Sequence, residues 1–214
     1  MKQLLLSRRR ILQGLGASLL VPGAFAAGDL PGDSVYRLDA ALVDQDGKPF
    51  ALADLRGTPV LASMFYTSCD MVCPMIFETM HATLRALPAG QRANVRVLMA
   101  SFDPARDTVE VLKKTAQARS CDGQWVLARG DEATARKLAA VLGIQYRKLA
   151  NGEFNHSSTL LLLDPQGRIK ARSGKLGAAD PALVAAVGRW REPTLRIPAE
   201  TTSPHAHRAN PIVL

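Results

Sequence analysis

Hydrophobic and polar positions along the middle of the chain alternate between short apolar runs and longer amphipathic stretches. Short runs of apolar and small residues are typical of strands that are buried on both faces, as in a parallel sheet. Such runs predict strands over 58–65, 95–102, 125–128 and 159–163.

Between these strands, apolar residues recur at the spacing of a helix that packs on one face. The first helix is predicted to begin near Pro74, because the missing N–H of a proline costs little in a first turn. Its apolar positions are Met75, Phe77, Met80, Leu84 and Leu87. Further helices are predicted over 107–118, 131–142 and 179–190, with Gly143 ending the one that precedes it.

Turn signals complete the predicted fold. Asp46-Gly47 predicts an N-terminal β-hairpin between 35–43 and 49–52, and 164–167 predicts a turn into a return strand over 168–171. Strands that alternate with helices indicate an α/β fold, a central mixed sheet flanked by helices with right-handed crossovers. The order of elements resembles the thioredoxin-like layout.

Composition agrees with one globular domain. The chain has 214 residues, 47% hydrophobic and 21% charged, which excludes a collagen, a coiled coil or a disordered chain as a description of the whole. The net charge is +8, but four basic residues and no acidic residue lie within 1–26. The remainder is only mildly basic, so no nucleic-acid partner is expected.

The first 26 residues have the pattern of an export signal. Arg8 and Arg9 precede a moderately apolar run that ends at Ala24-Phe25-Ala26, an A-x-A cleavage pattern. The paired arginines resemble a twin-arginine signal. An ordinary secretory signal and an uncleaved anchor stay open, so we expect a periplasmic protein, membrane-associated if the segment is not cleaved. We then expect a linker over 27–33, a domain over 34–190 and a flexible tail over 191–214.

Cys69 and Cys73 are the most informative pair in the chain. Cys69 follows a predicted buried strand, and Cys73 lies at the start of the predicted helix. A helix N-terminus lowers thiol pKa values and so favours the thiolate, which is both a nucleophile and a soft metal ligand. The three residues between them leave more room for an ion than a C-x-x-C loop does. The alternative is a structural disulfide.

His156 is the predicted third donor, since it directly precedes the strand over 159–163. In a thioredoxin-like sheet the loop before that strand lies beside the cysteine loop. Two thiolates and one imidazole suit copper, whereas zinc accepts the same donors but prefers four. His81 is expected to point along its helix, and His205 and His207 lie in the predicted tail. The sequence therefore predicts a copper site.

Three segments resemble the Sco/SenC family of copper-binding assembly proteins. They match its C-x-x-x-C-P loop, its S-x-D-P-x-R-D-T segment and its H-S…L-D-P-x-G segment. Here these are residues 69–74, 101–108 and 156–167, in that order within a match over about 33–190. The resemblance implies a thioredoxin-like fold and copper held by Cys69, Cys73 and His156.

By the same resemblance, the protein delivers copper to, or matures, the dinuclear copper centre of cytochrome c oxidase. Its partners would be a copper-accepting oxidase subunit or similar copper enzyme, and other periplasmic copper carriers or thiol reductases. The alternative function is a thiol–disulfide reductase that keeps the oxidase cysteines reduced, with Cys69 and Cys73 as its redox dithiol. A peroxidase-like thiol enzyme is disfavoured.

Four polar residues near these motifs receive structural interpretations. Asp70 is expected to cap the following helix. Asp103 and Arg106 are expected to shape a loop rather than bind metal. No other cysteine lies near Cys121 in the sequence, so Cys121 is expected to be a packed thiol.

Overall fold

The computed structural model describes residues 30–190. The predictions for 1–26 and 191–214, including the tail histidines, lie outside these residues. Within 30–190 no helix is both long and apolar enough to span a bilayer.

A five-stranded mixed sheet forms the centre of the domain, in the order β5-β4-β3-β8-β9. Strand β3 (Val60–Phe65) pairs in parallel with β4 (Arg96–Ser101), which pairs in parallel with β5 (Trp125–Ala128). On its other side β3 pairs antiparallel with β8 (Leu160–Leu163), which turns into antiparallel β9 (Ile169–Ser173). Every residue of β3 is buried, as predicted for a central strand.

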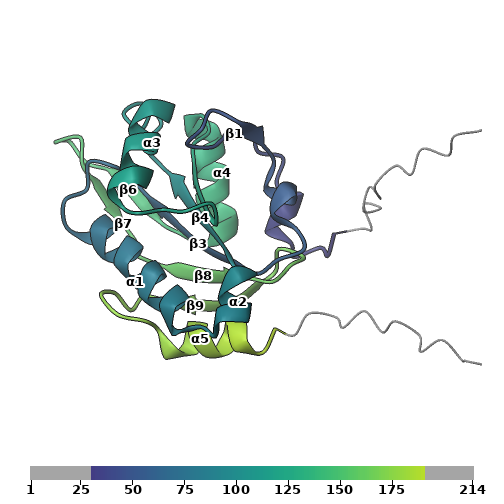
Figure 1. The fold of residues 1–214 in the computed structure, drawn as a ribbon. Coiled ribbons are helices and arrows are strands. Elements are labelled where there is room, and N and C mark those ends of the chain that lie inside the picture. The colour runs from purple at the N-terminus through teal and green to yellow at the C-terminus, as the bar shows by residue number, and fades with distance from the viewer. Residues whose placement is uncertain (1–29, 191–214) are drawn as a thin grey trace, which may run out of the picture. The chain divides into compact units, whose positions relative to one another are not determined.

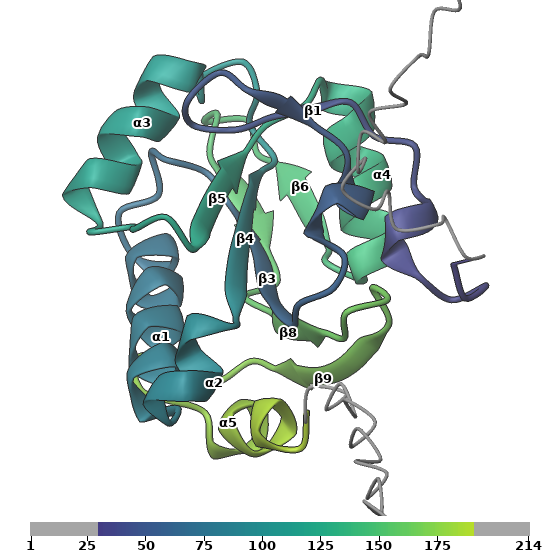
Figure 2. The same cartoon turned by 45° about the vertical axis from the view of Figure 1, so that its right-hand side comes forward.

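Helices cover both faces of this sheet. Figure 2 shows α1 (Val72–Ala86), α3 (Val109–Ala118) and α5 (Pro181–Gly188) on one side and α4 (Glu132–Leu142) on the other. Both parallel crossovers move along the sheet in the same direction, so right-handedness puts α1 and α3 on one face. A short helix, α2 (Ala89–Ala93), follows α1 and was not predicted (Figure 1).

Helix ends follow the predicted chemistry at most positions. Asp131 caps α4 by accepting from the Thr134 N–H, and Gly143 ends that helix at a φ of +64°. Asp180 caps α5, ahead of Pro181. The buried face predicted for α1 is wrong at one position, because Met75 is 42% exposed.

The N-terminal hairpin is shorter than predicted. Only β1 (Leu42–Val43) and β2 (Pro49–Phe50) pair, across a turn at Gly47. The residues predicted to begin the first strand form instead a 3₁₀ turn over Val35–Arg37, because the Ser34 hydroxyl accepts the Tyr36 N–H. Val35 and Tyr36 are both buried, which the alternating faces of a half-buried strand would not allow.

A second hairpin lies between α4 and β8 and was not predicted. Strand β6 (Tyr146–Lys148) pairs antiparallel with β7 (Phe154–His156) in a separate two-stranded sheet. This hairpin brings residues 154–156 to the carboxyl-terminal edge of the parallel strands, where the cysteine loop also lies.

Candidate metal centre

Cys69 and Cys73 lie on the turn that joins β3 to α1. The strand ends at Phe65 and the helix begins at Val72, so Cys69 lies in the loop and Cys73 in the first helical turn. Both are buried, at 9% and 3% exposed. All three cysteines of the chain are free thiols in this structure.

Backbone N–H groups at the start of α1 interact with the Cys69 sulfur. The Cys73 N–H donates to Cys69 Sγ over 3.4 Å, so the sulfur accepts a bond that a capping oxygen would otherwise accept. Burial works to raise the pKa of Cys69, but the backbone N–H groups of residues 71–73 outweigh it and hold that pKa below its ordinary value. The prediction that the helix terminus favours the thiolate is thus confirmed at Cys69.

Cys73 behaves differently. Burial raises the pKa of the Cys73 thiol well above its ordinary value, and a negative charge on Cys69 raises it further. The predicted lowering is wrong at this residue, because its sulfur is enclosed rather than pointed at free N–H groups. A bound cation would supply the charge that stabilises a second thiolate here.

Asp70 does not cap α1. The residue preceding the helix is Met71, which makes no side-chain cap, and the Asp70 carboxylate accepts no hydrogen bond from the first turn. The sequence-based interpretation of Asp70 is therefore wrong, since the Cys69 sulfur occupies the place expected for its carboxylate.

His156 lies at the end of strand β7 rather than in the loop predicted for it. It pairs with Tyr146 across the hairpin, and the next residue, Ser157, donates its N–H to the Gln145 carbonyl over 2.8 Å. These backbone bonds fix the direction in which the imidazole leaves the strand. The strand end carries the ring toward the cysteine loop.

The imidazole is oriented for metal binding. Its Nδ1 lies 3.4 Å from the Ser157 carbonyl oxygen, and since a carbonyl can only accept, Nδ1 carries the proton. Nε2, with its lone pair, lies 4.0 Å from Cys73 Sγ. Burial lowers the pKa of His156, although the contact with the Ser157 carbonyl works against it, and so favours the neutral ring. A ligating histidine commonly donates its other nitrogen in this way.

The structure brings the three predicted donors together. Cys69 Sγ, Cys73 Sγ and the His156 ring nitrogen lie within 4.8 Å of one another. Bonds of about 2.0–2.3 Å to a common ion place two ligand atoms no more than about 4.6 Å apart. Small side-chain movements would therefore close the three donors around one ion. Two thiolates and an imidazole fit copper.

Aromatic rings pack against one side of the His156 imidazole. The imidazole lies 5.1 Å from the Phe102 ring and 5.9 Å, edge to face, from the Tyr66 ring. Phe154 contacts both of these rings. The histidine therefore stands against apolar rings on one side, and on the other it lines a hollow of about 440 Å³ with Cys69.

Asp107 holds the cysteine loop in place. Its buried carboxylate accepts from the Thr67 N–H over 3.2 Å and also from the hydroxyls of Thr67 and Ser101. Thr67 lies two residues before Cys69. This carboxylate, in the loop between β4 and α3, therefore fixes the backbone that leads to the first candidate donor.

Arg106 holds the hairpin that carries His156. It pairs with Asp103, donates to the Gly152 carbonyl over 2.8 Å and lies 3.6 Å from Glu153. The Tyr66 hydroxyl donates to the same Glu153 over 2.7 Å. Asp103 and Arg106 therefore shape a loop, as predicted, and that loop joins the hairpin to the rest of the site.

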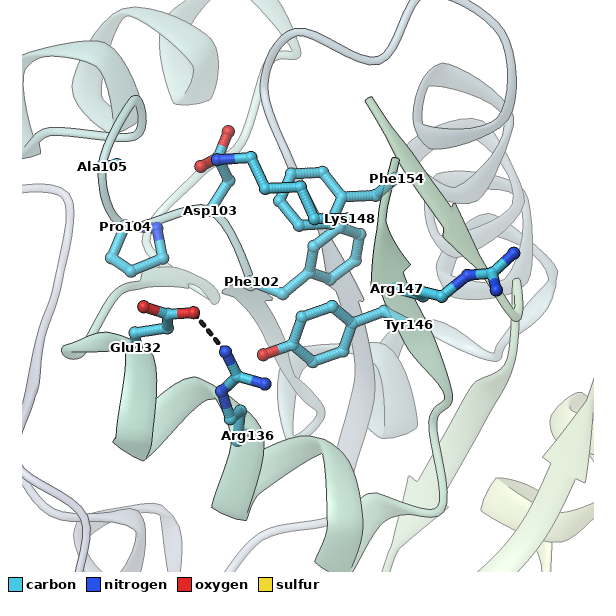
Figure 3. A pocket seen from close by; sticks show the side chains of 10 residues that line it. All are labelled: Phe102, Asp103, Pro104, Ala105, Glu132, Arg136, Tyr146, Arg147, Lys148 and Phe154. Carbon is cyan, nitrogen blue, oxygen red and sulfur yellow. Dashed lines mark hydrogen bonds and ion pairs between the residues drawn. The ribbon is translucent and has the colours of Figure 1, made fainter. Parts of the chain in front are cut away.

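A second hollow lies on the far side of these rings. Figure 3 shows the side chains of Phe102, Tyr146 and Phe154 gathered between the β6–β7 hairpin and the 103–105 loop, with the ion pair of Glu132 and Arg136 at its rim. Its volume is about 410 Å³. Phe154 lines both hollows, so it separates this one from the candidate metal centre.

The remaining candidates lie elsewhere. His81 packs on Trp125 at 4.4 Å and its Nε2 contacts the Arg119 carbonyl, so it points away from the cysteines as predicted. Cys121 is half-buried beside the same carbonyl, ahead of β5 and thus at the opposite edge of the parallel strands. Burial raises the pKa of its thiol, which agrees with a packed rather than a reactive cysteine.

Sequence comparison identifies relatives over most of this domain. The sequence profile of the SCO1/SenC family matches residues 33–190. A relative from Stutzerimonas stutzeri, named for copper binding, is 27% identical over 60% of this chain and 64% of its own length. The "SCO1 protein homolog" of Bacillus subtilis is 26% identical over 75% of this chain and 86% of its own.

Comparison with solved structures also identifies Sco proteins. The structure of Bradyrhizobium japonicum ScoI with copper bound is 27% identical, with a TM-score of 0.61, over 71% of this chain and 97% of that one. The thioredoxin-like fold expected from the order of elements is thereby confirmed.

Proposed function

The chain belongs to the SCO1/SenC family, and from that premise we propose that it binds copper through Cys69, Cys73 and His156 and passes it to a copper enzyme. The convergence of two sulfur atoms and one imidazole within 4.8 Å carries the proposal. The copper is cargo, so the site has to release it as well as hold it. A site at the edge of the sheet, beside an open hollow, allows both.

The recipient we propose is the dinuclear copper centre of cytochrome c oxidase. The implied partner is the oxidase subunit that carries this centre, and similar periplasmic copper enzymes are the alternative recipients. What supports this is family membership together with a donor set that favours copper. Incubation of the copper-loaded protein with copper-free oxidase subunit tests it, with transfer expected to the subunit and not to a cysteine-free variant of it.

Copper titration tests the ligand set. We expect His156→Ala to weaken Cu(II) binding by at least about tenfold, or about 1.4 kcal/mol, and to shift the thiolate-to-copper absorption. Folding should persist, because His156 lies at the edge of a two-stranded sheet. The matched control is a His205→Ala, His207→Ala double variant, with an unchanged spectrum expected. Parent-like binding and spectrum in His156→Ala would overturn the ligand assignment.

A second function has support from the same two cysteines. Cys69 Sγ accepts the Cys73 N–H, so the two side chains lie close enough to form a disulfide with little backbone movement. In that function the two thiols are oxidised to a disulfide while one disulfide of the partner is reduced to two thiols. This exchange needs no imidazole donor, so His156→Ala should retain it and Cys69→Ser should lose it.

We also propose that the protein works in the periplasm. The support is the sequence of residues 7–26, with its arginine pair, apolar run and A-x-A site. Changing Arg8 and Arg9 together to Lys is expected to leave the protein in the cytoplasm in a fractionation experiment. Unchanged export of that double variant would remove the twin-arginine route and leave an ordinary secretory signal.

A further inference from the structure

Two methionines beside the cysteines are exposed to solvent. Met71 is 76% exposed and Met75 is 42% exposed. The other methionines of the described residues behave as core side chains, each 0% exposed: Met64, Met80 and Met99. The thioethers of Met71 and Met75 therefore lie outside the core, although the sequence pattern predicted Met75 to be part of it.

Both thioethers belong to residues at the start of α1. Met71 directly precedes the helix with a helical backbone, at φ −111° and ψ −65°, and Met75 follows four residues later. Residues four apart are neighbours on a helix surface. Met71 also lines the hollow that contains Cys69 and His156. Met71 therefore stands at the outer edge of the candidate metal centre, and Met75 lies one helical turn further along, with its methyl group beside Gly177.

The chemistry of this position favours Cu(I). A thioether is a soft, uncharged donor that selects Cu(I) over harder divalent ions. It also binds copper without losing a proton, unlike a thiol. Cys73, in contrast, is only 3% exposed and lies behind the hollow that Cys69 and Met71 line. Exposed thioethers at the rim would meet incoming copper before the enclosed thiols do.

We propose that Met71 and Met75 form a transient Cu(I) entry site that passes copper to Cys69 and Cys73, an inference that rests on the proposed copper-binding function. The step is a ligand exchange in which thioether–copper bonds break as thiolate–copper bonds form. Copper stays Cu(I), and the protons of the two thiols leave to solvent. Neutral thioethers hold the ion more weakly than thiolates, so transfer runs inward.

Methyl NMR of methionine tests the site itself. In a Cys69→Ser, Cys73→Ser variant with ¹³C-labelled methionine methyl groups, anaerobic Cu(I) is expected to shift Met71 and Met75 in a saturable way. Met64, Met80 and Met99 are built-in controls whose resonances should stay in place. No shift at Met71 and Met75 would overturn the proposal and leave the pair as a surface for protein contact.

The kinetics of loading test its role. A Met71→Leu, Met75→Leu variant keeps apolar bulk but removes both sulfur atoms, so Cu(I) uptake in stopped flow is expected to slow by about tenfold. Equilibrium copper affinity should stay at the parent value, because the three inner donors are intact. Parent-like uptake by this variant would overturn the entry site. Failure of the parent itself to bind copper would overturn the proposed function instead.

Discussion

Arg106 and Asp107 are joined by one peptide bond, yet they hold opposite halves of the candidate metal centre. Asp107 accepts from the backbone and hydroxyl of Thr67 on the cysteine loop. Arg106 reaches the other way, to the Gly152 carbonyl on the hairpin that carries His156. The distance between the cysteine loop and the imidazole is therefore set by this short segment after β4, and neither residue contacts the metal donors.

Removal of the Arg106 side chain is expected to weaken copper binding. In Arg106→Leu the hairpin loses its contacts with Gly152 and Glu153, so His156 is less firmly held near the sulfur atoms. We expect copper affinity to fall by about tenfold, measured by competition with a chromophoric chelator. Thermal stability is expected to fall as well, because the buried Asp103 carboxylate loses the arginine that pairs with it.

Arg168 supplies a matched control for this change. It pairs with the buried Asp164, its side chain is 41% exposed against 39% for Arg106, and it lies on the β8–β9 turn. Arg168→Leu should therefore leave copper affinity unchanged. An equal loss in the two variants would show that Arg106 acts through general stability rather than by positioning His156.

Asp107 is expected to make stability depend on pH. Burial raises the pKa of this carboxyl, although hydrogen bonds from Ser101 and Thr67 work against the shift. Because the folded state holds the proton more tightly than the unfolded chain, stability falls as pH rises from the ordinary pKa of 3.8 through the folded value. Above the folded pKa, this loss of stability is complete and no longer changes with pH.

Comparison with Asp107→Asn isolates this contribution, because Asn does not titrate. In urea unfolding of the copper-free proteins, the stability of the parent relative to the variant should decline as pH rises across the window. The titratable groups that interact with the carboxyl are Asp103, Arg106 and the Cys73 thiol, and all three are present in both proteins. A difference that is flat with pH would contradict the raised pKa.

The sheet and its helices could be predicted because buried strands and helix ends leave strong local signals. The strand over 125–128 was predicted to the residue, and α4 lies between its predicted cap, Asp131, and its predicted stop, Gly143. The β6–β7 hairpin left a turn signal, Asn151-Gly152, whose glycine has a φ of +85°, but its strands left none. Its strands are three residues long and mostly polar or half-exposed, so contacts with Arg106 and the aromatic rings determine them rather than any hydrophobic period.

The candidate donors could be predicted because their residue types are rare and their chemistry is specific. Cys69, Cys73 and His156 are brought within 4.8 Å as expected. The residues that position them were missed or only partly understood. Thr67, Arg106 and Glu153 are ordinary loop residues by type, and only the pairing of distant segments reveals what they hold.

The start of α1 gives a test of helix capping. Asp70 makes no cap there, because the Cys69 sulfur accepts the N–H bond of the first turn. Asp70→Ala is therefore expected to leave the free energy of unfolding unchanged. Thr108 does cap α3, by accepting from the Val111 N–H over 3.3 Å, so Thr108→Ala should cost about 1 kcal/mol. Urea unfolding of both variants measures the contrast, and equal losses would contradict it.

The two site cysteines should form a disulfide with each other and not with Cys121. Their sulfur atoms lie within 4.8 Å, while Cys121 lies ahead of β5 at the other edge of the sheet and has a pKa raised by burial. A mild oxidant applied to the copper-free protein is expected to link Cys69 to Cys73, as peptide mapping by mass spectrometry would detect. The oxidised protein should then fail to bind copper, because its sulfur atoms are no longer thiolates.

Prior loading with Cu(I) should slow the oxidation, since both thiolates are then engaged. Cys121→Ser is the control, with oxidation at the parent rate expected. A bridge from Cys121 to either site cysteine would require the sheet to open, and its detection in folded protein would overturn the assignment of the dithiol.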